Sequence, residues 1–205
     1  MNKIRKKGRG RPRQFDRDEV LDRALKLFWA RGLSGTSLDD LSAAMNMKRP
    51  SLQNAFGDKE SLYRHVLARF VVRMKAESGA ILFEEPDLEA ALVKFLDAAI
   101  RVYCSAEPAL GCLVMCTATL EAGTHPEVRR DLKQVIAELD AVLSARFSQA
   151  KEAGQLPPGA DVRALAQVMQ SIQHSVALRA RAGESRASLR KMARSAVKLI
   201  CGGAA

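Results

Sequence analysis

Residues 36–62 read TSLDDLSAAMNMKRPSLQNAFGDKESL. Apolar residues recur every three or four positions in two short runs, which is the pattern of amphipathic helices. Asn46 lies between the runs, where a tight turn needs a left-handed residue, and Asn adopts that conformation more readily than most side chains. A third run begins after Gly57, behind a cap at Asp58. The stretch therefore predicts a helix-turn-helix over about residues 37–56.

A basic segment, residues 1–14, precedes this stretch. It holds seven Lys and Arg residues and no acid, so the chain's formal net charge of +10 falls to +3 without it. A basic segment broken by Gly and Pro does not fold alone, but it can neutralise phosphates and place Arg side chains in a minor groove. We expect a flexible arm that contacts DNA through Arg9, Arg11 and Arg13. A solubilising or targeting tail is the alternative.

The rest of the chain favours helices. Apolar residues make up 47% of the sequence and aromatic residues only 5%, and the apolar set is mostly Ala, Leu, Val and Met, which suits helices better than sheets. Helical periodicity continues to the C-terminus, with Gly and Pro at the breaks and a lapse from Gly79 to Asp87. We expect an all-α fold of about nine helices, over residues 16–32, 37–45, 49–56, 58–74, 88–103, 112–122, 126–154, 161–183 and 185–200.

Several functional classes lack support in the sequence. No apolar run follows the basic N-terminus as in a signal peptide, and the longest nearly apolar stretch, residues 110–120, is too short to span a bilayer. We therefore expect a cytoplasmic protein without a membrane partner, whose four Cys are free thiols. The three His have no partner visible in the sequence, and no phosphate loop or nucleophile elbow appears. We expect no enzyme activity, no cofactor and no metal.

A family resemblance rests on two segments that follow the basic arm. They are FDRDEVLDRALKLFWARG (residues 15–32) and GTSLDDLSAAMNMKRPSLQNAFGDKESLY (residues 35–63), which resemble the TetR family of transcriptional regulators. The match is specific over about residues 9–70 and rests on helix order and length beyond that. The resemblance implies a DNA-binding head over residues 15–62 and a helical regulatory and dimerisation body over residues 63–205. It also implies a homodimer on a palindromic DNA operator, released by a small-molecule effector.

The expected DNA contacts come from the second helix of the motif and its flanks. A helix-turn-helix places that helix in the major groove with its N-terminal end toward the bases. Arg suits guanine, and Gln or Asn suits adenine, because each pair forms two hydrogen bonds. The resemblance adds phosphate contacts from Thr36, Ser37 and Lys59. The candidates are Thr36, Ser37, Lys48, Arg49, Pro50, Ser51, Gln53, Asn54 and Lys59. A solvated helix face without function is the alternative.

Three residues depart from the family pattern. The family usually has Gly where this chain has Asn46, Ser or Thr where it has Lys48, and Tyr where it has Gln53. Lys48 cannot accept hydrogen bonds from the first amides of a helix, although it can contact phosphate. These departures affect the preferred operator more than DNA binding itself.

The body is expected to hold an effector pocket and a dimer interface. Polar residues among the inward apolar positions suggest a pocket, with core packing as the alternative for each. The pocket candidates are Phe95, Tyr103, Met115, Thr119, Phe147, Met169, Gln173 and His174. Apolar residues of the last two helices exceed the needs of one helix stripe and predict an interface with a second copy. The interface candidates are Ile172, Val176, Leu189, Met192, Ala193, Ala196 and Val197.

Two other functions stay open. Cys112 and Cys116 are four residues apart on a predicted helix, with Cys104 near them in sequence. Such thiols could sense an electrophile, an oxidant or a soft metal, or they could be small buried apolar residues. An architectural DNA-binding protein without a ligand would also have a basic arm. The body of more than a hundred residues favours a regulated dimer over that alternative.

Overall fold

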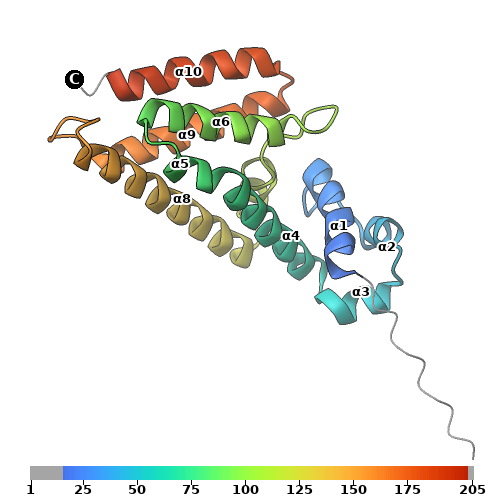
Figure 1. The fold of residues 1–205 in the computed structure, drawn as a ribbon. Coiled ribbons are helices and arrows are strands. Elements are labelled where there is room, and N and C mark those ends of the chain that lie inside the picture. The colour runs from blue at the N-terminus through green and yellow to red at the C-terminus, as the bar shows by residue number, and fades with distance from the viewer. Residues whose placement is uncertain (1–15, 203–205) are drawn as a thin grey trace, which may run out of the picture.

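The computed structural model describes residues 16–202. The arm contacts expected of Arg9, Arg11 and Arg13 lie outside the described residues. Within the described range all regular structure is helical (Figure 1), which confirms the all-α fold. The α-helices are α1 (Arg17–Arg31), α2 (Leu38–Met45), α3 (Arg49–Phe56), α4 (Lys59–Met74), α5 (Ala80–Glu84), α6 (Leu88–Tyr103), α7 (Thr119–Glu121), α8 (Pro126–Glu152), α9 (Val162–Arg181) and α10 (Arg186–Gly202).

Two wide π-helical turns lengthen these helices. The turn η1 (Lys75–Gly79) joins α4 to α5, and η2 (Val114–Ala118) leads into α7. Each joined set forms one continuous helix, so the described residues form nine separate helices, the number expected. None of the helices in this range is long and apolar enough to cross a membrane.

Helices α1 to α3 form a small head at one end of the molecule (Figure 1). Asp16 caps α1 by accepting a hydrogen bond from the amide of Asp18 at 2.9 Å. The head core contains Phe28, Leu41, Met45 and Leu52, which are almost completely buried. Burying these side chains holds the three short helices together, since helices of eight residues are not stable alone.

Helix α4 runs from the head into the body, where α6, α8, α9 and α10 pack together (Figure 1). Helix α9 packs against α8 and α10, and α10 also packs against α6. The continuous helix formed by α4, η1 and α5 is longer than expected, because residues 79–84 are helical although the sequence predicted a break there. The π turn supplies one extra residue and shifts the 3.6-residue register, which hides the helix from a periodicity search. Leu82, beyond the turn, is fully buried.

The expected dimer residues of α9 and α10 are placed mostly inside the single chain. Four of them, Val176, Leu189, Ala193 and Val197, are fully or almost fully buried in the chain's own core, whereas Ile172, Met192 and Ala196 are partly buried. The four buried residues therefore serve the fold of one chain. The strongly exposed apolar side chains on these two helices are Val168, Leu178 and Leu199.

Candidate nucleic-acid interface and effector cavity

The turn between α2 and α3 has helix-turn-helix geometry. Ser37 caps α2 in a reciprocal box with Asp40, with both backbone-to-side-chain hydrogen bonds at 3.1 Å. Asn46 adopts φ 50° and ψ 44°, the left-handed conformation expected from the sequence. The amide of Met47 then donates to the carbonyl of Ser42 at 3.0 Å, which closes the end of α2. The local sequence therefore fixes the angle at which α3 leaves the turn.

Helix α3 has one buried face and one exposed face. Leu52 and Phe56 are buried against the head. The structure places the expected contacts on the other face, and all are exposed: Lys48, Arg49, Pro50, Ser51, Gln53 and Asn54. Lys48 makes no capping hydrogen bond through its side chain, as its chemistry requires. The exposed face is polar and has basic side chains at its N-terminal end, which suits the major groove.

Arg49 forms an ion pair that sequence reasoning missed. Its Nε donates to Asp39 Oδ1 at 2.8 Å, and its Nη2 also contacts Oδ2 of that carboxylate. Asp39 lies on α2, and the turn brings it beside the start of α3. Both side chains are more than half exposed, so breaking the pair costs roughly 1 kcal/mol or less. Arg49 can therefore exchange this carboxylate for a base or a phosphate.

Thr36 and Lys59 face each other at the base of the motif. Thr36 is 1% exposed, and its hydroxyl donates to the carbonyl of Gly32 at 2.7 Å. Its hydroxyl is therefore used inside the head, and Ser37 caps the helix instead. Lys59 Nζ donates to the carbonyl of Thr36 at 2.9 Å. An ammonium group has three donors, so Lys59 retains hydrogen-bonding capacity for a phosphate.

The body contains a cavity of about 390 Å³ between the α4–α5 helix and helices α6, α8 and α9. Five of the eight pocket candidates line it: Phe95, Tyr103, Met115, Gln173 and His174. Phe147 and Met169 are fully buried core residues that do not line it, and Thr119 instead donates to the carbonyl of Met115 at 2.7 Å. The structure adds Phe70, Met74, Leu82, Phe83, Leu139 and Gln170, among others. The inward helical spacing of Phe70, Met74 and Leu139 was visible in the sequence, but not which inward residues border a void. Leu82 and Phe83 lie in the stretch that was expected to be a break.

Tyr103, His174 and Cys112 line this cavity and are uncharged near neutral pH, whereas Lys75 and Glu138 line it as an ion pair. Burial raises the pKa of Tyr103 far above its usual value and lowers that of His174. Burial also raises the pKa of the Cys112 thiol to about 11 and raises that of Cys116. All three expected sensing thiols, Cys104 included, are buried, and each is 7% exposed. No group of three or more potential metal ligands occurs among residues 16–202.

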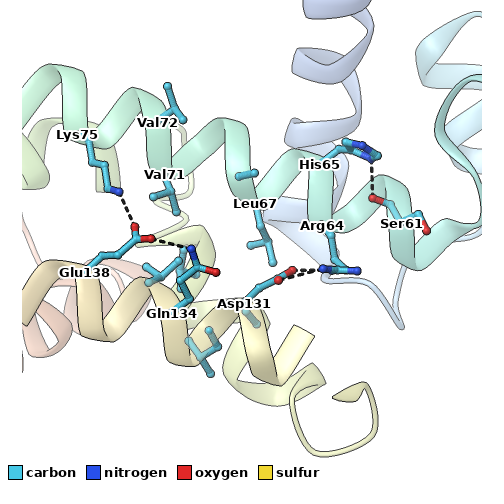
Figure 2. Close-up of a pocket in the computed structure, with 15 residues that line it drawn as sticks. Ser61, Arg64, His65, Leu67, Val71, Val72, Lys75, Asp131, Gln134 and Glu138 are labelled. Carbon is cyan, nitrogen blue, oxygen red and sulfur yellow. Dashed lines mark hydrogen bonds and ion pairs between the residues drawn. The ribbon is translucent and has the colours of Figure 1, made fainter. Parts of the chain in front are cut away.

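A second cavity, of about 500 Å³, lies between α4 and α8. Figure 2 shows two ion pairs that span it. Arg64 donates to both carboxylate oxygens of Asp131, at 2.6 and 3.1 Å, and Lys75 Nζ lies 2.5 Å from Glu138. Because these charges already have partners, they brace α4 against α8 more readily than they bind an ionic ligand.

The head touches the body through a compact set of hydrogen bonds, which we call the joint. Glu121, 6% exposed, accepts bonds from the Ser34 hydroxyl at 2.6 Å and the Ser34 amide at 2.9 Å. The Tyr63 hydroxyl lies 2.6 Å from that of Thr117, which itself donates to the carbonyl of Leu113. Thr117 belongs to η2, whose Val114 and Met115 line the cavity of about 390 Å³. The cavity wall and the joint therefore share one helical turn.

Comparison with known proteins agrees with this arrangement. The family model "Bacterial regulatory proteins, tetR family" matches residues 20–66, and "Tetracyclin repressor-like, C-terminal domain" matches residues 89–196. The chain is 36% identical to the HTH-type transcriptional repressor ComR of Escherichia coli strain K12 over 195 residues, which cover 95% of this chain and 93% of ComR.

Solved structures match over the same extent. A cysteine mutant of the TetR family regulator CifR, complexed with 26 bp operator DNA, aligns with a TM-score of 0.84 at 30% identity, covering 92% of this chain and 98% of CifR. A regulator from Cytophaga hutchinsonii aligns with a TM-score of 0.79 at 22% identity, covering 91% and 93%. Together with the helix-turn-helix head and the helical body, these matches show that the chain is a DNA-binding transcriptional regulator and belongs to the TetR family.

Proposed function

We propose that this regulator is a homodimeric repressor that binds a palindromic operator and leaves it when a small molecule occupies the cavity of about 390 Å³. The observation that carries the proposal is the exposed polar face of α3. The cap of α2 and the left-handed conformation of Asn46 fix the orientation of this face. The repressor ComR and the operator-bound CifR, similar along nearly the whole chain, support repression through operator binding.

The joint supplies a physical route for that release. A ligand that displaces Met115 or Val114 acts on η2, and η2 holds Thr117 against Tyr63 of α4. Helix α4 begins directly after the reading helix α3. A small shift of η2 therefore changes the position of the head relative to the body, and in a dimer it changes the spacing of the two reading helices.

A footprint of the purified protein on the DNA that flanks its own gene tests the proposal. We expect protection of one short palindrome, with far weaker binding to scrambled DNA of equal length. Uniform protection of all sequences would instead support an architectural DNA-binding protein. The control is a variant with Gln53→Ala and Asn54→Ala, which keeps the charge and the buried side of α3 but should lose the preference for the palindrome.

A thiol-based sensor is the second candidate, and one observation favours it. Cys112 lines the effector cavity, so an electrophile that enters the cavity meets its sulfur. The raised pKa of Cys112 opposes the idea, because the thiolate is the reactive form. Treatment with N-ethylmaleimide should release operator DNA from the native protein but not from Cys112→Ser. Equal release from both proteins would exclude Cys112 as the sensor.

A further inference from the structure

One buried polar atom in the effector cavity lacks a partner. Gln173 lines the cavity and is 6% exposed, and its carbonyl oxygen Oε1 makes no hydrogen bond to any described residue. Leaving such an acceptor without a donor is unfavourable by an amount comparable to a lost hydrogen bond. A ligand that brings a donor to this oxygen removes that penalty when it binds.

A hydrogen bond to Tyr103 occupies the nitrogen of this amide. Gln173 Nε2 donates to the hydroxyl oxygen of Tyr103 at 3.1 Å. The phenolic oxygen is therefore the acceptor in this bond, and the amide oxygen is the atom left without a partner.

The charges around the cavity exclude a strong ionic anchor. His174 is neutral near pH 7 because burial lowers its pKa. Lys75 and Glu138 both line the cavity and form an ion pair with each other at 2.5 Å. The remaining lining is dominated by apolar side chains such as Phe70, Leu82 and Leu139. An ionised ligand would lose its hydration there and gain no opposite charge in return.

We propose that the effector is a small, neutral, mainly apolar molecule that carries one hydrogen-bond donor, such as an alcohol or a phenol, and that this group donates to Gln173 Oε1. The inference rests on the proposed function and names the chemical class of its ligand. The cavity volume of about 390 Å³ lies at the small end of the range for ligand pockets, so one or two rings, or a short chain, match its size.

Calorimetric titration of the full-length protein with three matched probes tests the ligand class. 2-Naphthol carries a donor, 2-methoxynaphthalene carries only an acceptor, and 2-naphthoate is an anion of similar size. We expect 2-naphthol to bind roughly three- to tenfold more tightly than the ether, the usual effect of one hydrogen bond, and the anion to bind most weakly. Tighter binding of the ether or the anion, or binding of none of the three, would overturn the proposal.

Two variants locate the donor site. Gln173→Leu keeps a similar volume and removes the acceptor, so the preference for 2-naphthol over 2-methoxynaphthalene should disappear. Met115→Leu changes another cavity-lining residue without removing a hydrogen-bonding group, and it should retain the preference. If Gln173→Leu kept the full preference, Gln173 Oε1 would not be the contact.

Operator release is measured separately for the same probes. If 2-naphthol binds the protein more tightly than the ether but does not release operator DNA, the ligand class stands and release by an effector is removed from the proposed function. If the protein binds the operator but none of the three probes binds the protein or releases the DNA, the DNA-binding function stands and the proposed ligand class is wrong.

Discussion

Lys48 places a positive charge on the face expected to bind DNA, but it leaves the start of α3 without a side-chain cap. It occupies the cap position of α3 with φ −73° and ψ 144°, and its side chain makes no capping bond. Lys48→Ser should raise the free energy of unfolding by about 1 kcal/mol, the usual value of a serine cap. It should also weaken binding to every DNA sequence, because one positive charge is lost. Urea unfolding and salt-dependent binding measure the two effects. A variant with the native stability and the native salt dependence of DNA binding would contradict this account.

Arg49 and Gln53 should read bases, whereas Lys59 should contact phosphate. Arg49→Ala and Gln53→Ala are each expected to cost about 1–3 kcal/mol of binding free energy on the operator and to relax the preference at one position per half-site. Lys59→Ala should weaken operator and scrambled DNA about equally, since a phosphate carries no base identity. Competition titrations on both DNAs separate the classes. A Gln53→Ala variant with unchanged specificity would make Gln53 a phosphate contact.

The sequence predicted the exposed positions of Arg49 and Gln53 on α3, but not which residues they contact. The exposed face of α3 follows from apolar spacing, because Leu52 and Phe56 must face inward. The ion pair of Arg49 with Asp39 depends on the angle between α2 and α3, which the spacing does not contain. The burial of Thr36, whose hydroxyl donates to the carbonyl of Gly32, likewise depends on how the chain folds back between α1 and α2.

Between elements, Arg69 of α4 clamps α1 through Asp22. Arg69 Nε donates to Asp22 Oδ1 at 2.9 Å, and this hydrogen bond, ahead of the charges of nearby basic residues, lowers the pKa of Asp22. A carboxyl group whose pKa is lower in the folded state stabilises the fold above its unfolded pKa, and that contribution is lost as the pH falls through the folded value.

Asp22→Asn should therefore destabilise the protein at pH 7 and reduce the loss of stability as the pH falls below about 4. Urea unfolding at a series of pH values measures both quantities. Asp18→Asn is the matched control, because Asp18 also contacts Arg69, at 2.8 Å, but leaves the pair with Asp22 in place. An acid slope of the Asp22→Asn protein equal to that of the native protein would show that the clamp does not govern acid sensitivity.

The arm, residues 1–14, should act as a separate element that adds affinity without specificity. Deleting residues 1–13 removes seven positive charges, which should weaken binding to all sequences and flatten the dependence of affinity on salt. The footprint on the palindrome should keep its position. Binding to operator and scrambled DNA between about 50 and 200 mM salt measures the effect. A truncated protein with the native salt slope would exclude the arm from the DNA interface.

Element boundaries were predictable where caps and breakers mark them, as at Asp16, Ser37 and Asp58. The prediction was wrong at residues 79–84. A Gly and a lapse of periodicity resemble a loop, yet the helix continues through a π turn, and the Ser78 hydroxyl bonds the carbonyl of Met74 at 2.5 Å. A period of 3.6 residues cannot detect a turn that holds one more residue.

At the scale of the whole molecule, the sequence predicted which helix faces are apolar. It did not predict whether an apolar face packs in the chain's own core or against a second copy. Val176 and Leu189 satisfy either assignment by spacing alone, and the packing of α9 and α10 on α6 places both in the chain's own core. The surface left for a second copy contains Leu178, 53% exposed, and Leu199, 76% exposed. Helices α9 and α10 pack against each other, and we expect them to form a four-helix interface with their mates.

Leu178→Glu should therefore dissociate the dimer, because a charge at an apolar interface loses its hydration. Analytical ultracentrifugation at micromolar concentration should show a dimer for the native protein and mainly monomer for the variant. Leu120→Glu is the matched control, since Leu120 is 78% exposed on α7, away from α9 and α10, and it should remain dimeric. A monomeric native protein would remove the homodimer from the proposed function.

The joint also contains Trp29, the only tryptophan in the sequence. Its indole nitrogen donates to the carbonyl of Gly111 at 3.1 Å, its ring packs edge-to-face on Phe70 at 5.0 Å, and its carbonyl accepts from Arg181. Every photon of tryptophan emission therefore originates where the head meets the body. Trp29 is therefore an intrinsic fluorescence probe, and a change in its emission wavelength or intensity will report movement at this boundary without a label.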